Sequence, residues 1–105
     1  MQTIIQVISK GTTSLRDRIV NDSKLEEFEL YVVTKKKQGR SHGWAKLHMY
    51  HGDGAINIQW HGASRTLICR VVTRGGEPHS ISSAFIDFLL ARMRRQIAFI
   101  HVLPG

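Results

Sequence analysis

The residues best equipped for chemistry lie in the stretch GWAKLHMYHGDGAINIQWHG, residues 43–62. Read at every second position, this stretch separates into an apolar set and a set of aromatic, basic and amide side chains. The second set is Trp44, Lys46, His48, Tyr50, Asn57, Gln59 and His61. Aromatic rings stack on unpaired bases, cationic groups pair with phosphates, and amides hydrogen-bond to base edges. This combination is typical of a surface that binds single-stranded nucleic acid.

Basic residues outside this stretch extend the same surface. The sequence KKKQGR occupies residues 35–40, and Arg70 follows on a later predicted strand. We therefore predict that the nucleic-acid-binding residues are Lys35, Lys36, Lys37, Arg40, Trp44, Lys46, His48, Tyr50, Asn57, Gln59, His61 and Arg70. Tyr31 is a further stacking candidate, because it lies on the same face if the preceding strand joins the sheet.

The charge of the chain favours a polyanionic partner. Its net charge is +7, and the excess lies beyond residue 29: residues 1–29 hold four Lys/Arg and five Asp/Glu, whereas residues 30–105 hold eleven and three. A positive field of this size attracts polyanions. Two alternatives stay open for the aromatic face. It is either the subunit interface of a homodimer, since aromatic residues and arginine are enriched at interfaces, or the wall of a small-ligand pocket.

Residues suited to catalysis are few. Beyond residue 30 the only carboxylates are Asp53, Glu77 and Asp87, and Asp53 fits a turn. Hydrolases that use metals or paired carboxylates need at least two placed acids. The six histidines and the single Cys69 form no metal-ligand spacing, and nucleophile-elbow, Walker and dinucleotide motifs are absent. We expect a binding module rather than an enzyme, with no catalytic residue, cofactor or metal.

Three weaker patterns have structural explanations that compete with function. His48 and His61 share the predicted face and could form an acid–base pair, although only proximity supports this. Residues 73–82 place a glycine pair before a helix, where a phosphate could bind with help from Arg74, but such a pair is more often a turn. Arg92, Arg94 and Arg95 either complement the helix dipole or make a second phosphate contact.

The elements that position these residues follow from periodicity. We predict one domain over residues 1–105, with strands at 3–9, 27–36, 43–50, 54–61, 65–73 and 97–103. Helices are expected at 13–22, capped by Thr12 or Thr13, and at 80–96, capped by a serine. The predicted class is α+β: a mainly antiparallel sheet with a meander of four strands, two outer or inserted strands, one long helix packed on one face and a short N-terminal helix.

The last predicted strand, IAFIHVL, is apolar on both faces. This pattern is typical of a strand inside a sheet. We expect it to run parallel to the strand at 65–73 after a right-handed crossover.

The hairpin residues specify a register. With a turn at 51–54, the expected partners are Tyr50 with Ala55, His48 with Asn57, Lys46 with Gln59 and Trp44 with His61. A two-residue turn at Gly62 and Ala63 would pair Gln59 with Thr66, Asn57 with Ile68 and Ala55 with Arg70. The core face would then hold Ala45, Leu47, Met49, Ile56, Ile58, Trp60, Leu67, Cys69 and Val71.

The compartment is inferred from what the chain lacks. A single cysteine allows no internal disulfide and fits a reducing compartment. No apolar run reaches the roughly 20 residues of a membrane span, and the N-terminus lacks a basic start followed by a long apolar stretch. We expect a cytoplasmic location and no membrane partner.

Overall fold

The computed structural model describes residues 3–33, 42–75 and 78–104, and it has a mixed α+β architecture. The strands are β1 (Thr3–Ser9), β2 (Leu30–Val32), β3 (Trp44–Met49), β4 (Ala55–His61), β5 (Thr66–Val72) and β6 (Ile97–Leu103). The helices are α1 (Leu15–Val20) and α2 (His79–Met93). Short 3-10 turns occupy Leu25–Phe28, Gly62–Ser64 and Arg94–Gln96.

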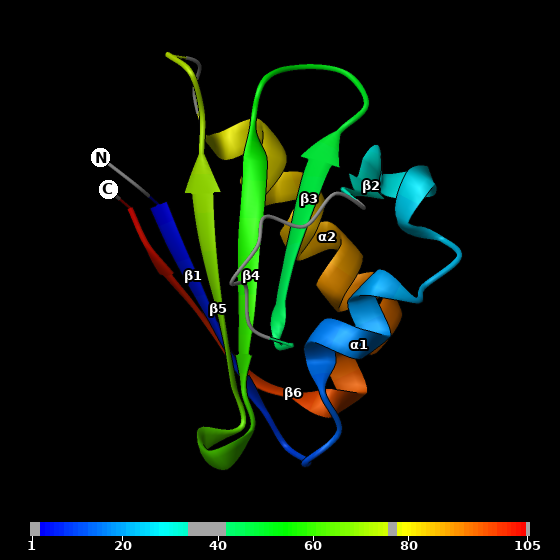
Figure 1. Ribbon diagram of the computed structural model, residues 1–105, viewed down its shortest axis with the longest axis vertical. Coiled ribbons are helices and arrows are strands. Elements are labelled where there is room, and N and C mark those ends of the chain that lie inside the picture. The colour runs from blue at the N-terminus through cyan, green and yellow to red at the C-terminus, as the bar shows by residue number, and fades with distance from the viewer. Residues whose placement is uncertain (1–2, 34–41, 76–77, 105) are drawn as a thin grey trace.

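The six strands form one antiparallel sheet in the order β2-β3-β4-β5-β1-β6 (Figure 1). The predicted four-strand meander is confirmed as β2 to β5. The strand β6 runs parallel to β5, as expected, with β1 between them. The prediction that β6 is internal is wrong: β1 takes the place beside β5, so β6 becomes an edge of the sheet.

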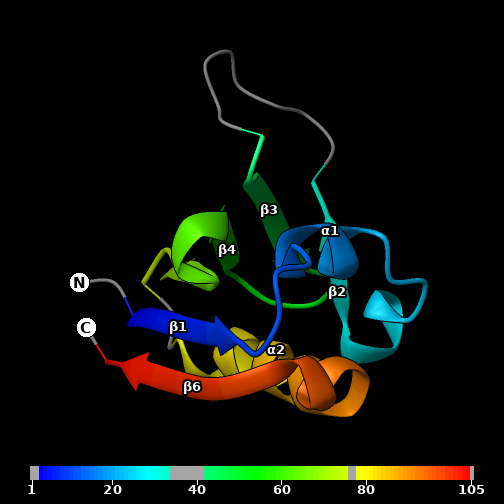
Figure 2. The ribbon, with the colours of Figure 1, turned by 90° about the horizontal axis from the view of Figure 1, so that it is seen from below.

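Both helices cover the same face of the sheet, which curves around them (Figure 2). Their side chains join those of the strands in one core, and the largest fully buried ones are Phe85, Phe88, Ile5, Leu15, Ile19, Leu30, Leu47, Ile56, Ile58, Leu67, Ile81 and Leu89. The alternation of the hairpin sequence therefore predicted the core face correctly. Because no helix of the described chain crosses to the other side, the second face of the strands stays open.

The helix boundaries differ from the predicted ones at their N-termini. Ser14 caps α1, with its hydroxyl accepting a hydrogen bond from the Asp17 N–H at 3.2 Å, so the expected cap at Thr12 or Thr13 is wrong. The helix α2 begins after Pro78 with no side-chain cap, and the expected serine cap is absent. Proline suits this position because its fixed φ angle matches the helix and it needs no N–H partner.

Within the described part of the predicted strand at 27–36, residues 27–29 form tighter structure and the strand is limited to 30–32, while residues 34–36 lie outside the described residues. A 3-10 turn ends at Phe28, and Glu29 adopts a left-handed conformation (φ 65°) before β2 starts. The turn lets Phe28 pack edge-on against Phe88 of α2, with ring centroids 5.6 Å apart. This helix contact outweighs the strand propensity of the segment.

The strand register is shifted by two residues from the predicted one. His48 pairs with Ala55, Lys46 with Asn57 and Trp44 with Gln59, because the β3–β4 loop spans Tyr50 to Gly54. Gly52 and Gly54 hold positive φ angles there, which favour glycine. The β4–β5 turn is also longer, so Asn57 pairs with Arg70, Gln59 with Ile68 and His61 with Thr66. A shift of two residues leaves every side chain on its predicted face.

Candidate functional site

The open face of the sheet carries a row of polar side chains across its middle. Lys46 on β3 lies beside Asn57 on β4, which lies beside Arg70 on β5. Cross-strand neighbours on one face have Cβ atoms about 5 Å apart, close enough for one ligand to contact several of them. The register therefore brings together three residues that the sequence assigned to one site.

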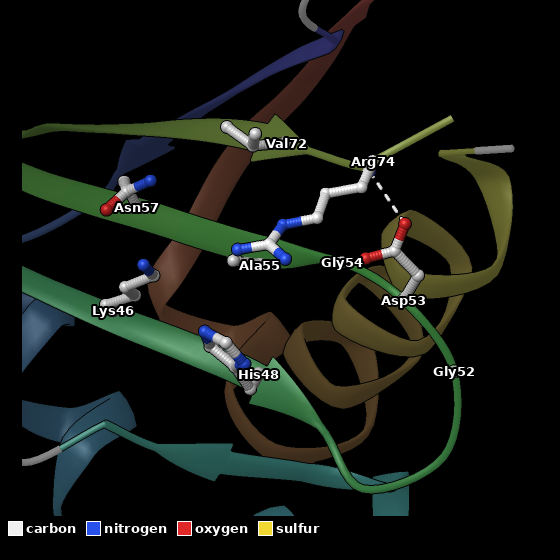
Figure 3. Close-up of a pocket in the computed structure, with 9 residues that line it drawn as sticks. All are labelled: Lys46, His48, Gly52, Asp53, Gly54, Ala55, Asn57, Val72 and Arg74. Carbon is white, nitrogen blue, oxygen red and sulfur yellow. Dashed lines mark hydrogen bonds between the residues drawn. The ribbon is translucent and has the colours of Figure 1, made fainter. Parts of the chain in front are cut away.

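A hollow of about 450 Å³ opens beside this row (Figure 3). Its lining consists of Lys46, His48, Gly52, Asp53, Gly54, Ala55, Asn57, Val72 and Arg74. Ala55 is buried and small, so the longer side chains around it form the walls. Lys46 and His48 of β3 and Arg74, two residues beyond the end of β5, supply nitrogen donors, which is the chemistry of an anion site.

Arg74 reaches this face because the end of β5 is tied to the β3–β4 loop. The main-chain N–H of Arg74 donates a hydrogen bond to Asp53 Oδ2 at 2.7 Å. In Figure 3 the guanidinium then extends over Ala55 toward His48. Asp53 lies in the predicted turn, and its carboxylate positions an arginine at the hollow.

The hollow favours the neutral form of His48. Partial burial, and then the charge of Lys46, lower the pKa of this imidazole below its usual value of 6.5. At neutral pH the ring is therefore mostly uncharged and can donate one hydrogen bond. An anion bound in the hollow would favour the protonated ring and would raise its pKa.

Aromatic rings adjoin the hollow on the side of β2. The ring of Tyr31 lies 5.8 Å from that of His48 and 4.8 Å from that of Tyr50, measured between centroids. Tyr50 is 53% exposed. A planar ligand could therefore reach Tyr50 while a charged group attached to it occupied the hollow.

The remaining predicted site residues are placed less favourably or lie elsewhere. Trp44 is only 6% exposed, so its indole is not presented to solvent for stacking. Its main-chain carbonyl accepts a hydrogen bond from Arg16 Nε at 3.1 Å. Gln59 is half-buried and His61 is exposed at the end of β4, away from the hollow. Lys35, Lys36, Lys37 and Arg40 lie outside the described residues.

Sequence reasoning missed Arg74 as part of this face. The glycine pair after it suggested a phosphate site at the start of the long helix instead. No local signal pointed to Arg74, because turn aspartates usually bond their own backbone and the partner of Asp53 is 21 positions away.

The structure provides no support for the other functional roles considered from the sequence. Arg92 pairs with Asp22 at 3.1 Å on the helix side of the sheet. Burial raises the pKa of the Cys69 thiol, which disfavours a nucleophilic role. Within residues 3–33, 42–75 and 78–104, no three His, Cys, Asp or Glu side chains gather as metal ligands. The described helices are all too short or too polar to cross a membrane.

Comparison with models of known protein families finds no match, and comparison with curated proteins and with solved structures finds no significant match. The candidate function therefore rests on the chemistry of the open face.

Proposed function

We propose that this protein binds single-stranded nucleic acid on the open face of its sheet. One phosphate would occupy the hollow, and an adjacent base would stack on Tyr50. The observation that carries the proposal is the convergence of Lys46, His48 and Arg74 around Ala55, next to the Tyr31–Tyr50 pair. The site thus offers both of the contacts that sequence-tolerant single-strand binders use, a cationic track and an aromatic platform.

The row Lys46–Asn57–Arg70 runs across the β-strands, and we propose that the bound nucleic acid follows it. Arg70 is exposed and two strands away from Lys46, so it would meet a neighbouring phosphate. Asn57 lies between the two cations, where its amide can hydrogen-bond to a sugar or a base edge. Lys35, Lys36, Lys37 and Arg40 precede β3, and we predict that they add further phosphate contacts.

Single strands fit this chemistry better than duplexes do. Stacking on Tyr50 requires a base whose face is free, and bases in a duplex are already stacked on each other. The net charge of +7 would still attract duplex DNA, but only through its phosphates. We therefore expect tighter binding to a single strand than to a duplex of the same sequence.

The test measures fluorescence anisotropy of a labelled, mixed-sequence single-stranded oligonucleotide, with the duplex and inorganic polyphosphate as competitors. The variant Arg74→Gln should weaken binding, whereas Arg95→Gln, which removes the same charge beyond α2, should not. Replacing Tyr50 by leucine should reduce the preference over polyphosphate, and replacing it by phenylalanine should preserve it. Equal competition by polyphosphate in all variants would contradict a role for stacking.

The same assay addresses the segment before β3. Substituting Lys35, Lys36 and Lys37 together by glutamine should weaken oligonucleotide binding and reduce its dependence on salt. An unchanged salt dependence would show that these lysines contact no phosphate.

A further inference from the structure

The edge strand β6 has only one of the features that usually protect an exposed edge, a bulge at Ala98 where its pairing with β1 shifts register. Natural edge strands are short, or carry charges, prolines or bulges that prevent pairing with another chain. The other edge of this sheet, β2, is only three residues long, whereas β6 has seven residues, IAFIHVL, with no proline and no Lys, Arg, Asp or Glu. It pairs with β1, and no strand of the described chain lies on its other side.

Both faces of β6 present apolar side chains to solvent. Phe99 is 60% exposed and Leu103 is 56% exposed on the open face of the sheet, and Val102 is exposed on the helix face. On the helix face, α2 leaves a groove of about 430 Å³ along the strand. Apolar side chains of α2, among them Ile86 and the 46% exposed Leu90, line this groove. No described residue of this chain covers the apolar groove at this edge of the sheet.

From these observations we infer that β6 pairs antiparallel with β6 of a second copy, so that two chains form a closed two-fold dimer with a continuous sheet. A two-fold axis perpendicular to the sheet brings the same strand edge of both copies together. It also places the two grooves on the same side, where the two α2 helices meet. In that arrangement β6 becomes internal, as its sequence pattern predicts. The two α2 helices cover its helix face, and on the open face Phe99 and Leu103 pack beside their counterparts in the second copy.

The charges on α2 favour a second copy over an unrelated strand. Leu90 of α2 and Arg94, which begins the 3-10 turn directly after α2, both line the groove. Asp87 is exposed on α2 one turn before Leu90. When two such helices run antiparallel with their centre between Leu90 and Ala91, Asp87 of one copy faces Arg94 of the other, twice. The apolar stripe is thus flanked by charges that complement each other across the two-fold axis.

The dimer would also extend the open face. An axis perpendicular to the sheet keeps the two open faces on the same side, so two copies of the hollow would look in one direction. The inference nevertheless stands on β6 and α2 alone, and it is independent of what the open face binds.

The test is sedimentation velocity of the full chain, without nucleic acid, at concentrations from about 1 to 200 µM and at low and high salt. We expect a species of twice the chain mass of 11.9 kDa that persists at high salt. Replacing Phe99 by lysine should weaken dimerisation about a hundred-fold or more, because it puts a charge into the apolar interface. The matched control is Val72→Lys, which places the same charge on an exposed apolar site of β5.

A charge exchange tests the antiparallel helix contact directly. Asp87→Arg and Arg94→Asp should each weaken the dimer, and the double variant should restore it. A wild-type chain that stays monomeric at all concentrations, a mass above that of a dimer, or a double variant that fails to recover would overturn the proposed arrangement. Dimers that dissociate in Val72→Lys but persist in Phe99→Lys would move the interface from β6 to the β4–β5 part of the open face.

Amide hydrogen exchange of β6 tests the strand pairing, because the fold of a single chain would not protect the outer amides of this strand. In the dimer, the β6 amides that point away from β1 are hydrogen-bonded and should exchange slowly. In Phe99→Lys the same amides should exchange rapidly while those of β1 stay protected. Rapid exchange of these amides in the wild-type protein would contradict strand pairing.

Discussion

Replacing Lys46 by glutamine should weaken oligonucleotide binding and flatten its dependence on salt. Each phosphate contact to a single strand contributes about 0.7 to the slope of log K against log salt concentration. Losing one contact should therefore lower the slope by about 0.7, which at about 0.1 M salt is a five-fold weaker affinity. Five-fold corresponds to about 0.9 kcal/mol.

The pH of the measurement matters because the charge of Lys46 affects the pKa of His48. Its charge is the second cause, after burial, of the lowered pKa of His48. Removing Lys46 should let that pKa rise, and a partly protonated His48 would then replace some of the lost charge. At about pH 8 the imidazole is neutral in both proteins, so the slope difference there reports on Lys46 alone.

The assay is anisotropy of a labelled single-stranded oligonucleotide titrated at several salt concentrations. Lys24→Gln is the matched control: Lys24 lies on the segment before β2, 3.9 Å from Glu27, and its loss changes the net charge equally. Only the Lys46 variant should change the slope. If both variants lower the salt slope equally, net charge rather than the hollow governs binding. If neither variant changes the slope, no phosphate lies beside Lys46.

Three further expectations follow from the packing and the pKa values. Because the pKa of His48 is lowered in the free protein and a bound phosphate would raise it, oligonucleotide affinity should increase as the pH falls from about 7.5 to 5.5; titrations over this range should show a smaller increase for His48→Gln. Gly43→Ala should destabilise the fold by about 1–3 kcal/mol, since the new Cβ would lie 2.7 Å from the carbonyl oxygen of Trp60. Urea unfolding measures this, and Gly11→Ala is the control because a Cβ there meets nothing within 4 Å; equal stabilities would contradict the close approach. Cys69 should react with a thiol reagent only after unfolding, as burial raises its pKa and removes access, and rapid reaction of the native protein would argue against this packing.

The alternation of apolar and polar residues was the sequence feature that predicted the fold best. A strand with one buried face needs apolar residues at every second position, so the residue types alone assigned Leu47, Ile56, Ile58 and Leu67 to the core. The assignment survived the register error, because the pairing moved by two residues and side chains repeat with that period. The meander and the long helix were predictable for the same reason.

The site residues were only partly predictable. Lys46, His48, Asn57 and Arg70 were recognised as one surface from their alternation, and the register brings them together. The burial of Trp44 was not predictable, because exposure depends on what packs around a side chain rather than on its face alone.

Contacts between distant segments were decided only by the tertiary structure. The hydrogen bond between Asp53 and Arg74 joins residues 21 positions apart and turns an arginine into a wall of the hollow. The insertion of β1 between β5 and β6 leaves β6 at an edge, although its sequence is that of an internal strand. Strand order is set by long-range pairing, on which local residue patterns carry little information. Local periodicity thus determined which face each residue occupies, while the tertiary structure decided which residues meet and which edge stays open.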